Sequence, residues 1–289
     1  MPLVVGRRKP GSRCRVNENK DAEIYFDLWR LIPDGDPFAT HSSRLFPVRR
    51  DGQPAMLKIA VEPEEKRGAA LMVRWNGVGA ARVLEHQDDA ILLERARGHR
   101  SLADMARNGR DDEASRIICG AVAALHASRG ASLPQLMPLT HRFRALEATA
   151  CREGGIFVRS AATAATLLSE PRDVVTLHGD VHHGNILDFA ERGWLAIDPK
   201  GLQGERGFDY ANLFCNPDNA VAIAPGRLAR QVHVVAEAAR LEPRRLLQWI
   251  VAWAGLSAAW MIEDGQSDQV QSPFNVADIA AAVLDGMSV

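Results

Sequence analysis

Apolar and polar residues alternate along much of the first third of the chain, the pattern of strands with one buried face. The strands expected from this pattern cover residues 25–29, 43–48, 55–61, 80–84 and 90–93. Asp51-Gly52 separates two of them, and Asp-Gly between apolar runs is a strong signal for a hairpin turn. The pattern therefore predicts a mostly β N-terminal region.

Helical spacing begins at residues 63–75, where Glu64 and Glu65 lie in a first turn that favours carboxylates. In the second half apolar residues recur every three or four positions. The helices expected there cover residues 111–129, 140–151, 160–168, 227–241, 243–262 and 275–284, with strands at 174–177, 186–189 and 194–197. We expect an α+β protein with an N-terminal extension (1–24), a mostly β lobe (25–95) and a mostly α lobe (96–289).

The composition is ordinary for a globular chain: of 289 residues, 46% are apolar and 25% are charged. A net charge of −1 gives no field that would recruit nucleic acid or an anionic membrane. The most apolar segment, 246–262, is shorter than the ~20 residues of a membrane span, which favours a buried helix. We expect no nucleic-acid or membrane partner, and a monomer or weak dimer.

Residues 1–20 carry several arginines but lack the apolar core of a secretory signal. We interpret them as a disordered leader, with a basic nucleic-acid arm as the alternative. Four cysteines are scattered along the chain without the spacing of a metal site. This favours reduced thiols and a cytoplasmic location.

The segment 177–198 has the spacing of a phosphoryl-transfer site. Asp180 is followed five residues later by Asn185 and thirteen residues beyond that by Asp198. Asp180 is suited to accept a proton from a substrate hydroxyl, while Asn185 and Asp198 offer hard oxygen ligands to the Mg²⁺ of Mg-ATP. Protein kinases space their catalytic aspartate and asparagine in the same way. The motif predicts a small-molecule kinase.

Histidines near this motif allow a second interpretation. His178, His182 and His183, together with the two aspartates, are candidates for a zinc or di-metal hydrolase centre. Adjacent residues in extended backbone point to opposite sides, however, which separates His182 from His183. We favour a local role in which His178 braces the catalytic loop, and a similar bracing or helix-capping role for Asp209.

Lys58 is embedded in an apolar strand, where an unpaired ammonium would be costly. We expect it to pair with ATP phosphates, with Glu65 on the following helix as its partner and Glu64 as the less favoured choice. An edge lysine that reaches water is the alternative. Glu94 and Ala96 lie at the expected lobe junction, where backbone groups would meet the adenine edge.

Three segments carry a resemblance to a known family: L-H-G-D-V-H-H-G-N-I-L at 177–187, G-W-L-A-I-D-P-K-G-L-Q-G-E at 193–205 and F-D-Y-A-N at 208–212. Supporting segments are 54–58, 75–84, 92–95, 111–114 and 245–260. The chain resembles the aminoglycoside phosphotransferases, more narrowly the streptomycin 6-kinases and their hydroxyurea-phosphotransferase relatives.

The resemblance implies a bilobal protein-kinase-like fold, ATP and Mg²⁺ as cofactors, and streptomycin phosphorylated at the 6-hydroxyl of streptidine. It implies the roles given above for Asp180, Asn185, Asp198 and Lys58. No glycine-rich loop precedes Lys58, so the backbone of residues 40–44 or the hydroxyls of Ser42 and Ser43 would have to serve the phosphates.

A dicationic aminocyclitol calls for carboxylates and an aromatic face in its pocket. The candidates for substrate binding are Glu205, Asp218, Trp260, Glu263 and Asp264. Other acceptors, such as hydroxyurea, a sugar amine or choline, would keep the same chemistry. A non-catalytic nucleotide-binding module of the same fold is the alternative from a different class.

Overall fold

The computed structural model describes residues 22–127, 135–266 and 268–287. Within them, the chain forms two compact units. The first contains the residues up to Glu62 together with Leu84–Arg95, and the second contains Pro63–Val83 together with the residues from Ala96 onward. The expected lobe at 25–95 is therefore interrupted, because residues 63–83 group with the helical unit.

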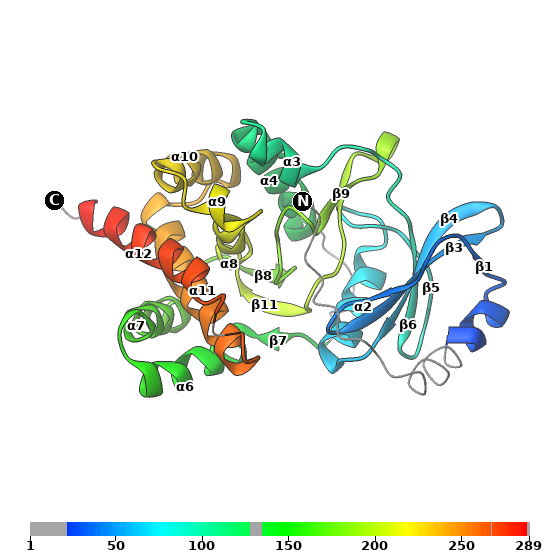
Figure 1. Cartoon of the computed structure of the whole chain (residues 1–289), viewed down its shortest axis with the longest axis horizontal. Helices are drawn as coiled ribbons and strands as arrows, with labels where there is room; N and C mark the ends of the chain where they lie inside the picture. The colour runs from blue at the N-terminus through cyan, green and yellow to red at the C-terminus, as the bar shows by residue number, and fades with distance from the viewer. Residues whose placement is uncertain (1–21, 128–134, 267, 288–289) are drawn as a thin grey trace. The chain divides into compact units, whose positions relative to one another are not determined.

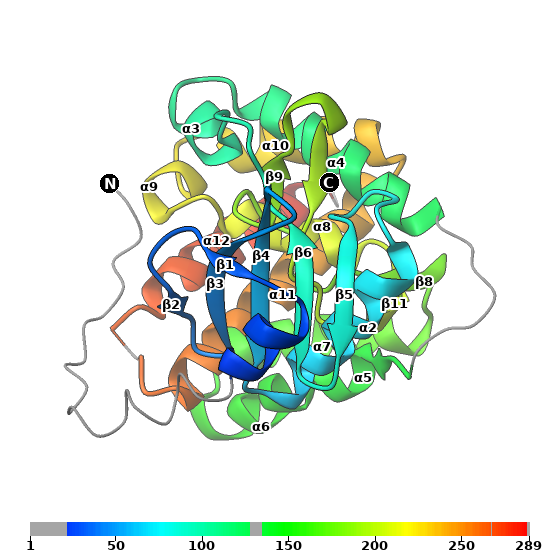
Figure 2. The same ribbon diagram turned by 90° about the vertical axis from the view of Figure 1, so that its right-hand side faces the viewer.

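The first unit contains a six-stranded sheet in the order β1-β3-β4-β6-β5, with β2 paired to β3 (Figure 2). Its strands are β1 (Ile32–Pro33), β2 (Phe38–Ala39), β3 (Ser43–Arg50), β4 (Gln53–Ala60), β5 (Val83–Gln87) and β6 (Ala90–Glu94). The expected hairpin joins β3 to β4, and Asp51 and Gly52 both have positive φ angles, 49° and 76°. Two positive φ angles match the twist that a two-residue hairpin needs.

The strand expected at 25–29 is wrong, because residues 22–28 are helical. Ala22 and Trp29 are buried seven residues apart, and Tyr25 and Phe26 pack partly buried between them. This is helical spacing, and it lays one face of the helix on the core of the sheet. Of the extension expected at 1–24, residues 22–24 thus belong to this helix, and the rest lies outside the described residues.

The register of the sheet determines where Lys58 points. Lys58 lies opposite Leu45 of β3 and Ile91 of β6. Its neighbours Leu57 and Ile59 are buried in the core of this unit. Because successive side chains in a strand point to opposite faces, Lys58 lies on the other face of the sheet.

The second unit is mostly helical. Its longer helices are α2 (Pro63–Trp75), α4 (Asp111–Ala127), α6 (Arg144–Glu153), α7 (Ile156–Ser169), α10 (Arg227–Ala239), α11 (Pro243–Glu263) and α12 (Gln271–Gly286). The shorter ones are α3 (Leu102–Arg107), α5 (Leu139–Arg142), α8 (Phe208–Ala211) and α9 (Asn219–Ala222), with 3-10 turns η1 (Ala190–Arg192) and η2 (Asn212–Cys215). The helix expected at 140–151 is divided at Phe143.

Helix α11 is the centre of this unit. It packs against α7 and α12, as Figure 1 shows. By length and composition it is apolar enough to cross a membrane, but 67% of that apolar window is buried inside the protein. Its apolar character is therefore explained by its position in the core of the unit, as the sequence predicts.

Short strands carry the segment that contains Asp180, Asn185 and Asp198. Strand β8 (Val174–Leu177) pairs antiparallel with β11 (Leu202–Glu205), and β7 (Met137–Pro138) joins β11 in parallel. Strand β9 (Ile186–Asp188) pairs with β10 (Trp194–Ala196). The loop between β8 and β9 and the loop between β10 and β11 contain the motif residues.

Candidate active site

The loop from His178 to Asn185 connects β8 to β9 and carries Asp180. Oδ1 of Asp180 accepts a hydrogen bond from the Asn212 amide at 2.9 Å, and Oδ2 accepts one from the Asn185 amide at 3.3 Å. The Asn185 amide also donates to the Asp180 carbonyl at 2.9 Å. Two amides thus orient a carboxylate whose side chain is 30% exposed and accessible to a substrate.

Asn212 was not among the predicted site residues. Its orientation is fixed because the Asn216 amide donates to its Oδ1 at 2.9 Å, which leaves Nδ2 as the group that donates to Asp180. Asn212 lies at the end of the F-D-Y-A-N segment. This segment resembles the family and was therefore a signal for Asn212. The distance in sequence between Asn212 and Asp180 gave no chemical reason to pair the two residues.

Asn185 and Asp198 are suited to hold a divalent cation. Asn185 turns its nitrogen toward Asp180, and no described residue donates to its Oδ1. Asp198 follows β10 and has a φ of 62°, a left-handed conformation that aspartate tolerates better than most residues. Both side chains offer hard oxygens, and Mg²⁺ usually takes one or two such protein ligands and completes its shell with water and phosphate oxygens. The donor set fits Mg²⁺.

His178 is the first residue of the loop that carries Asp180, and it is fully buried. Its Nδ1 accepts a hydrogen bond from the Asp180 backbone N–H at 3.2 Å, so the proton is on Nε2, which donates to the Ile197 carbonyl at 2.8 Å. Burial lowers the pKa of His178, in keeping with this neutral tautomer. The ring of Trp75, at the end of α2, stacks on the imidazole with centroids 6.2 Å apart.

Asp209 of α8 is 1% exposed and contacts the start of the same loop. Its carboxylate accepts hydrogen bonds from the backbone N–H of His178 at 2.9 Å and of Gly179 at 2.7 Å. His126 Nε2 lies 2.8 Å from Oδ2 of Asp209. Without this carboxylate, two buried backbone donors would be unsatisfied, so Asp209 holds the start of the loop in place.

Lys200 is a second residue that the sequence analysis missed. Its ammonium donates to Glu65 Oε1 at 2.9 Å and to Asp198 Oδ2 at 3.1 Å. Burial on its own lowers the pKa of Lys200, but the charges of Asp198 and Glu65 outweigh it and raise the pKa overall. The two carboxylates thus favour the charged form of Lys200, which lies beside a candidate metal ligand.

Helix α2 contacts the segment after β10 directly. A Cβ atom on Gly68 would lie 2.0 Å from the Pro199 carbonyl oxygen, and one on Gly201 would lie 2.9 Å from Cβ of Arg67. These approaches require glycine, because backbone atoms on the other side cannot move aside. The first half of α2 is thus fixed against residues 199–201, and its end is fixed against His178 by Trp75.

The other histidines do not form a metal site. His183 is buried, and neither of its ring nitrogens has a hydrogen-bond partner among the described residues. Burial, followed by the positive charge of Arg227, lowers the pKa of His183 to about 3. His182 accepts a hydrogen bond from the Gly184 backbone at 3.0 Å. Among the described residues, no three His, Cys, Asp or Glu side chains are grouped to hold a metal.

Of the predicted phosphate residues, Ser42 lies in the tight turn between β2 and β3, and Ser43 is the first residue of β3. The Thr40 backbone N–H donates to the Ser43 carbonyl at 2.9 Å, and the Ser43 backbone N–H donates to Thr40 Oγ1 at 3.1 Å. The Ser43 side chain is 1% exposed, and its hydroxyl has no partner among the described residues. The turn is closed by a threonine rather than by glycines.

The remaining nucleotide candidates divide between the two units. Lys58 and Glu94 belong to the first unit, while Glu65 and Ala96 belong to the second. The ion pair expected between Lys58 and Glu65 stays a prediction. Within the second unit, Glu65 is bound to Lys200, and its neighbour Glu64 forms an ion pair with Arg142.

Glu205 is engaged inside the protein. Arg245 donates to both of its oxygens, at 2.7 and 2.6 Å, and the Trp249 indole donates to Oε1 at 2.8 Å. Burial raises the pKa of Glu205, but the hydrogen bonds from Arg245 and Trp249 outweigh it and lower the pKa overall. The side chain is 5% exposed, so this carboxylate neutralises Arg245 and is not placed to meet a drug.

Asp218 and Trp260 also have internal partners. Asp218 caps α9 by accepting a hydrogen bond from the Val221 backbone at 3.1 Å, and it pairs with Arg107 at 2.8 Å. The guanidinium of Arg142 lies 4.4 Å from the centre of the Trp260 ring. Trp260 was predicted to stack on a guanidinium of the substrate. In the structure it stacks on the guanidinium of Arg142.

Glu263 and Asp264, at the C-terminal end of α11, are exposed. Neither carboxylate forms a hydrogen bond or ion pair with another described residue. Of the five predicted substrate residues, these two keep their charge available to a cation.

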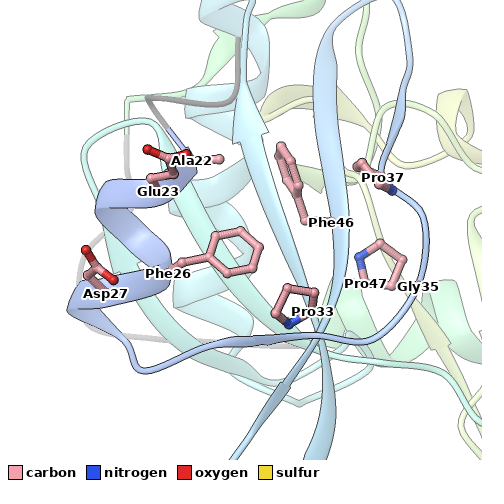
Figure 3. Close-up of a pocket in the computed structure, with 9 residues that line it drawn as sticks. All are labelled: Ala22, Glu23, Phe26, Asp27, Pro33, Gly35, Pro37, Phe46 and Pro47. Atoms are coloured by element: carbon pink, nitrogen blue, oxygen red, sulfur yellow. The ribbon is translucent and has the colours of Figure 1, made fainter. Parts of the chain in front are cut away.

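A cavity of about 430 Å³ lies in the first unit (Figure 3). It is lined by Phe26 of the first helix, Phe46 of β3 and several prolines, with Glu23 and Asp27 at its edge. None of the predicted nucleotide or substrate residues lines it.

Comparison with known proteins decides the family. Residues 28–265 match the family described as aminoglycoside/hydroxyurea antibiotic resistance kinase. The chain belongs to this family. It is accordingly a small-molecule kinase of the aminoglycoside class.

Two curated relatives of the kinase are similar over most of their length. A streptomycin 3''-kinase from Klebsiella pneumoniae is 48% identical over 89% of this chain and 98% of its own. A streptomycin 6-kinase from Streptomyces griseus is 33% identical over 88% of this chain and 86% of its own. The expectation of a 6-hydroxyl acceptor is not confirmed, because the 3''-kinase is the more similar of the two.

The solved structures agree on the fold. A thermostable mutant of the aminoglycoside phosphotransferase APH(4)-Ia, in a ternary complex with ADP and hygromycin B, matches with a TM-score of 0.65 at 13% identity. The match covers 90% of this chain and 97% of that one. At this identity the match shows the fold alone. It confirms the predicted protein-kinase-like architecture, with a β N-terminal part and a helical C-terminal part.

Proposed function

We propose that this kinase transfers the terminal phosphoryl group of Mg-ATP to a hydroxyl of streptomycin and thereby inactivates the drug. The observation that carries the proposal is the orientation of Asp180 by Asn212 and Asn185, within a chain that is 48% identical to a streptomycin kinase. Asp180 would be the catalytic base, with Asn185 and Asp198 as the metal ligands.

Asp180 would accept the proton of the substrate hydroxyl. Asn212 holds Oδ1 at 2.9 Å, so the more weakly bound Oδ2 is the oxygen better placed to take this proton. A bound Mg²⁺ would neutralise phosphate charge. Phosphoryl transfer depends mainly on positioning and electrostatics. The hydrogen bonds of Asp209 and His178 would therefore contribute to the rate by holding the backbone that positions Asp180.

The acceptor position divides the two streptomycin kinases. We propose the 3''-hydroxyl, because identity to the 3''-kinase is 48% against 33% for the 6-kinase. The 6-hydroxyl of streptidine is the second candidate. Structure determination of the product by phosphorus–proton correlation spectroscopy distinguishes them, because the phosphorus couples to the proton on the modified carbon.

Glu263 and Asp264 are the carboxylates that we propose for the cationic drug. Both are exposed at the end of α11, and neither is neutralised by a described residue. Their removal should raise KM for streptomycin while leaving KM for ATP unchanged. Equal effects on both constants would contradict a role in drug binding.

The decisive experiment is ADP release by the purified protein with Mg-ATP, with and without streptomycin. Asp180→Ala should lose about 10²- to 10⁴-fold in kcat, the usual contribution of a general base. The matched control is Asp278→Ala, an exposed aspartate on α12 outside the site. Near-normal turnover of the Asp180 variant would refute the assignment of the base.

Other acceptors are tested in the same assay. A hydroxyurea phosphotransferase from Kitasatospora aureofaciens is 28% identical, so hydroxyurea is the second compound to examine. Release with hydroxyurea but not with streptomycin would keep the kinase and change the acceptor. Binding of Mg-ATP without transfer to any acceptor would instead support the non-catalytic module. We further propose that the protein is cytoplasmic and that it is a monomer or weak dimer. Light scattering would check the oligomeric state.

A further inference from the structure

Lys200 is a buried cation that the proposed reaction does not use. Its ammonium lies between Glu65 at 2.9 Å and Asp198 at 3.1 Å. The side chains of Lys200 and Glu65 are 11% and 1% exposed, whereas that of Asp198 is 30% exposed. The ion pair therefore connects an interior carboxylate to a carboxylate at the candidate metal site.

The backbone of Lys200 is anchored as well. Its N–H donates to the His178 carbonyl at 2.7 Å, at the start of the catalytic loop. The side chain then reaches the first turn of α2, where Glu65 lies. Gly68 and Pro199 hold the same helix and the same segment together through a close backbone contact. Lys200 thus joins the catalytic loop, the metal-ligand segment and α2.

We propose that Lys200 is a positioning residue that holds Asp198 against α2 and competes with the metal ion for the Asp198 carboxylate. This inference rests on the proposed role of Asp198 as a metal ligand. A cation bound by Asp198 would share that carboxylate with an ammonium 3.1 Å away. The lysine therefore weakens ground-state metal binding while it fixes the ligand in the geometry that transfer requires.

A purely structural role gives a different expectation. If Lys200 only neutralised the buried Glu65, its removal would destabilise the protein without tightening metal binding. Competition for Asp198 predicts the opposite for the metal, because removing a positive charge at this distance strengthens the attraction of a cation. Metal affinity and turnover should therefore move in opposite directions.

The test uses Lys200→Gln, which can still donate to the carboxylates but carries no charge, and Lys200→Met as a second neutral variant. The control is Lys66→Met, an exposed lysine next to Glu65 on α2. Mn²⁺ replaces Mg²⁺, and free Mn²⁺ is measured by electron paramagnetic resonance in the presence of ADP. Turnover is measured separately with Mg-ATP and streptomycin.

We expect the Lys200→Gln variant to bind Mn²⁺ at least about threefold more tightly and to lose about tenfold or more in kcat. Lys200→Arg, which keeps the charge, should keep the wild-type Mn²⁺ affinity. Unchanged or weaker Mn²⁺ binding by the neutral variants would overturn the proposal, and so would unchanged kcat. Failure of streptomycin as an acceptor would refute the proposed function but would leave the Mn²⁺ measurement as a test of Lys200.

Discussion

Replacement of Asp209 by asparagine is the sharpest test of how the catalytic loop is held. The carboxylate satisfies the backbone N–H groups of His178 and Gly179 at 2.9 and 2.7 Å, and it lies 2.8 Å from His126 Nε2. An amide of the same shape has a single acceptor oxygen. Its NH₂ group would face one of these buried donors, because both carboxylate oxygens are in use.

The cost can be worked from these contacts. Leaving one buried donor unsatisfied costs about 1–3 kcal/mol, and a charged acceptor is worth about twice a neutral one. We therefore expect Asp209→Asn to lower the free energy of unfolding by about 2–4 kcal/mol. We also expect kcat to fall more than KM for ATP rises, because the loop that carries Asp180 loses its support while the residues proposed for nucleotide binding in the first unit are unchanged.

Urea unfolding followed by tryptophan fluorescence measures this effect. The chain has six tryptophans that contribute to this signal, and one of them, Trp75, stacks on His178 at the start of the loop. The control is Asp278→Asn, which changes an exposed carboxylate on α12. A change in unfolding free energy below about 0.5 kcal/mol, the usual range for surface substitutions, would refute the bracing role of Asp209.

Three further predictions concern other contacts of the second unit. Gly98→Ala should destabilise the protein by about 1–3 kcal/mol, because the new Cβ would lie 2.0 Å from the Asp188 carboxyl carbon. Thermal unfolding measures this effect, and an unchanged Tm would contradict it. Hydrogen bonds from Arg100 lower the pKa of Asp188 to about 2, so this stabilisation is complete above pH 3.8 and is lost as the pH falls toward 2. The difference in urea stability between wild type and Arg100→Gln should therefore shrink over that interval, and a constant difference would show that the pair does not act through this ionisation. Arg245→Met leaves Glu205 buried without its ion partner and should lower the free energy of unfolding by about 3–5 kcal/mol. The double variant Arg245→Met with Glu205→Gln should recover part of this loss in the same denaturation assay. No recovery would show that an uncompensated charge is not the cause.

Local signals in the sequence predicted the elements that depend on local chemistry. Helix α2 begins at Pro63 and ends at Trp75 as expected, because acidic residues mark its first turn and Asn76-Gly77 follows its last. The turn at Asp51-Gly52 was equally readable. The error at residues 25–29 arose because a short apolar run fits both periods, and only packing on the sheet decides between them.

Partners distant in sequence account for the rest. Lys200 and Glu65 are 135 positions apart, and no local pattern joins a lysine after a strand to a glutamate on an earlier helix. Glu205 and Arg245 are 40 positions apart, and their pairing turns a candidate drug ligand into an internal ion pair. Strand β11 was missed because Leu202-Gln203-Gly204-Glu205 has neither β-branched residues nor alternation.

Gly68 has a consequence for how such a kinase tolerates mutation. Its α-carbon faces the Pro199 carbonyl so closely that a Cβ would lie only 2.0 Å from that oxygen. A variant library selected on antibiotic should therefore retain glycine at this position as strictly as it retains Asp180, although glycine has no side chain to take part in the chemistry. A map of tolerated substitutions would therefore mark α2 as part of the active site. The intolerance at Gly68 would come from steric exclusion by Pro199, not from a role in the reaction.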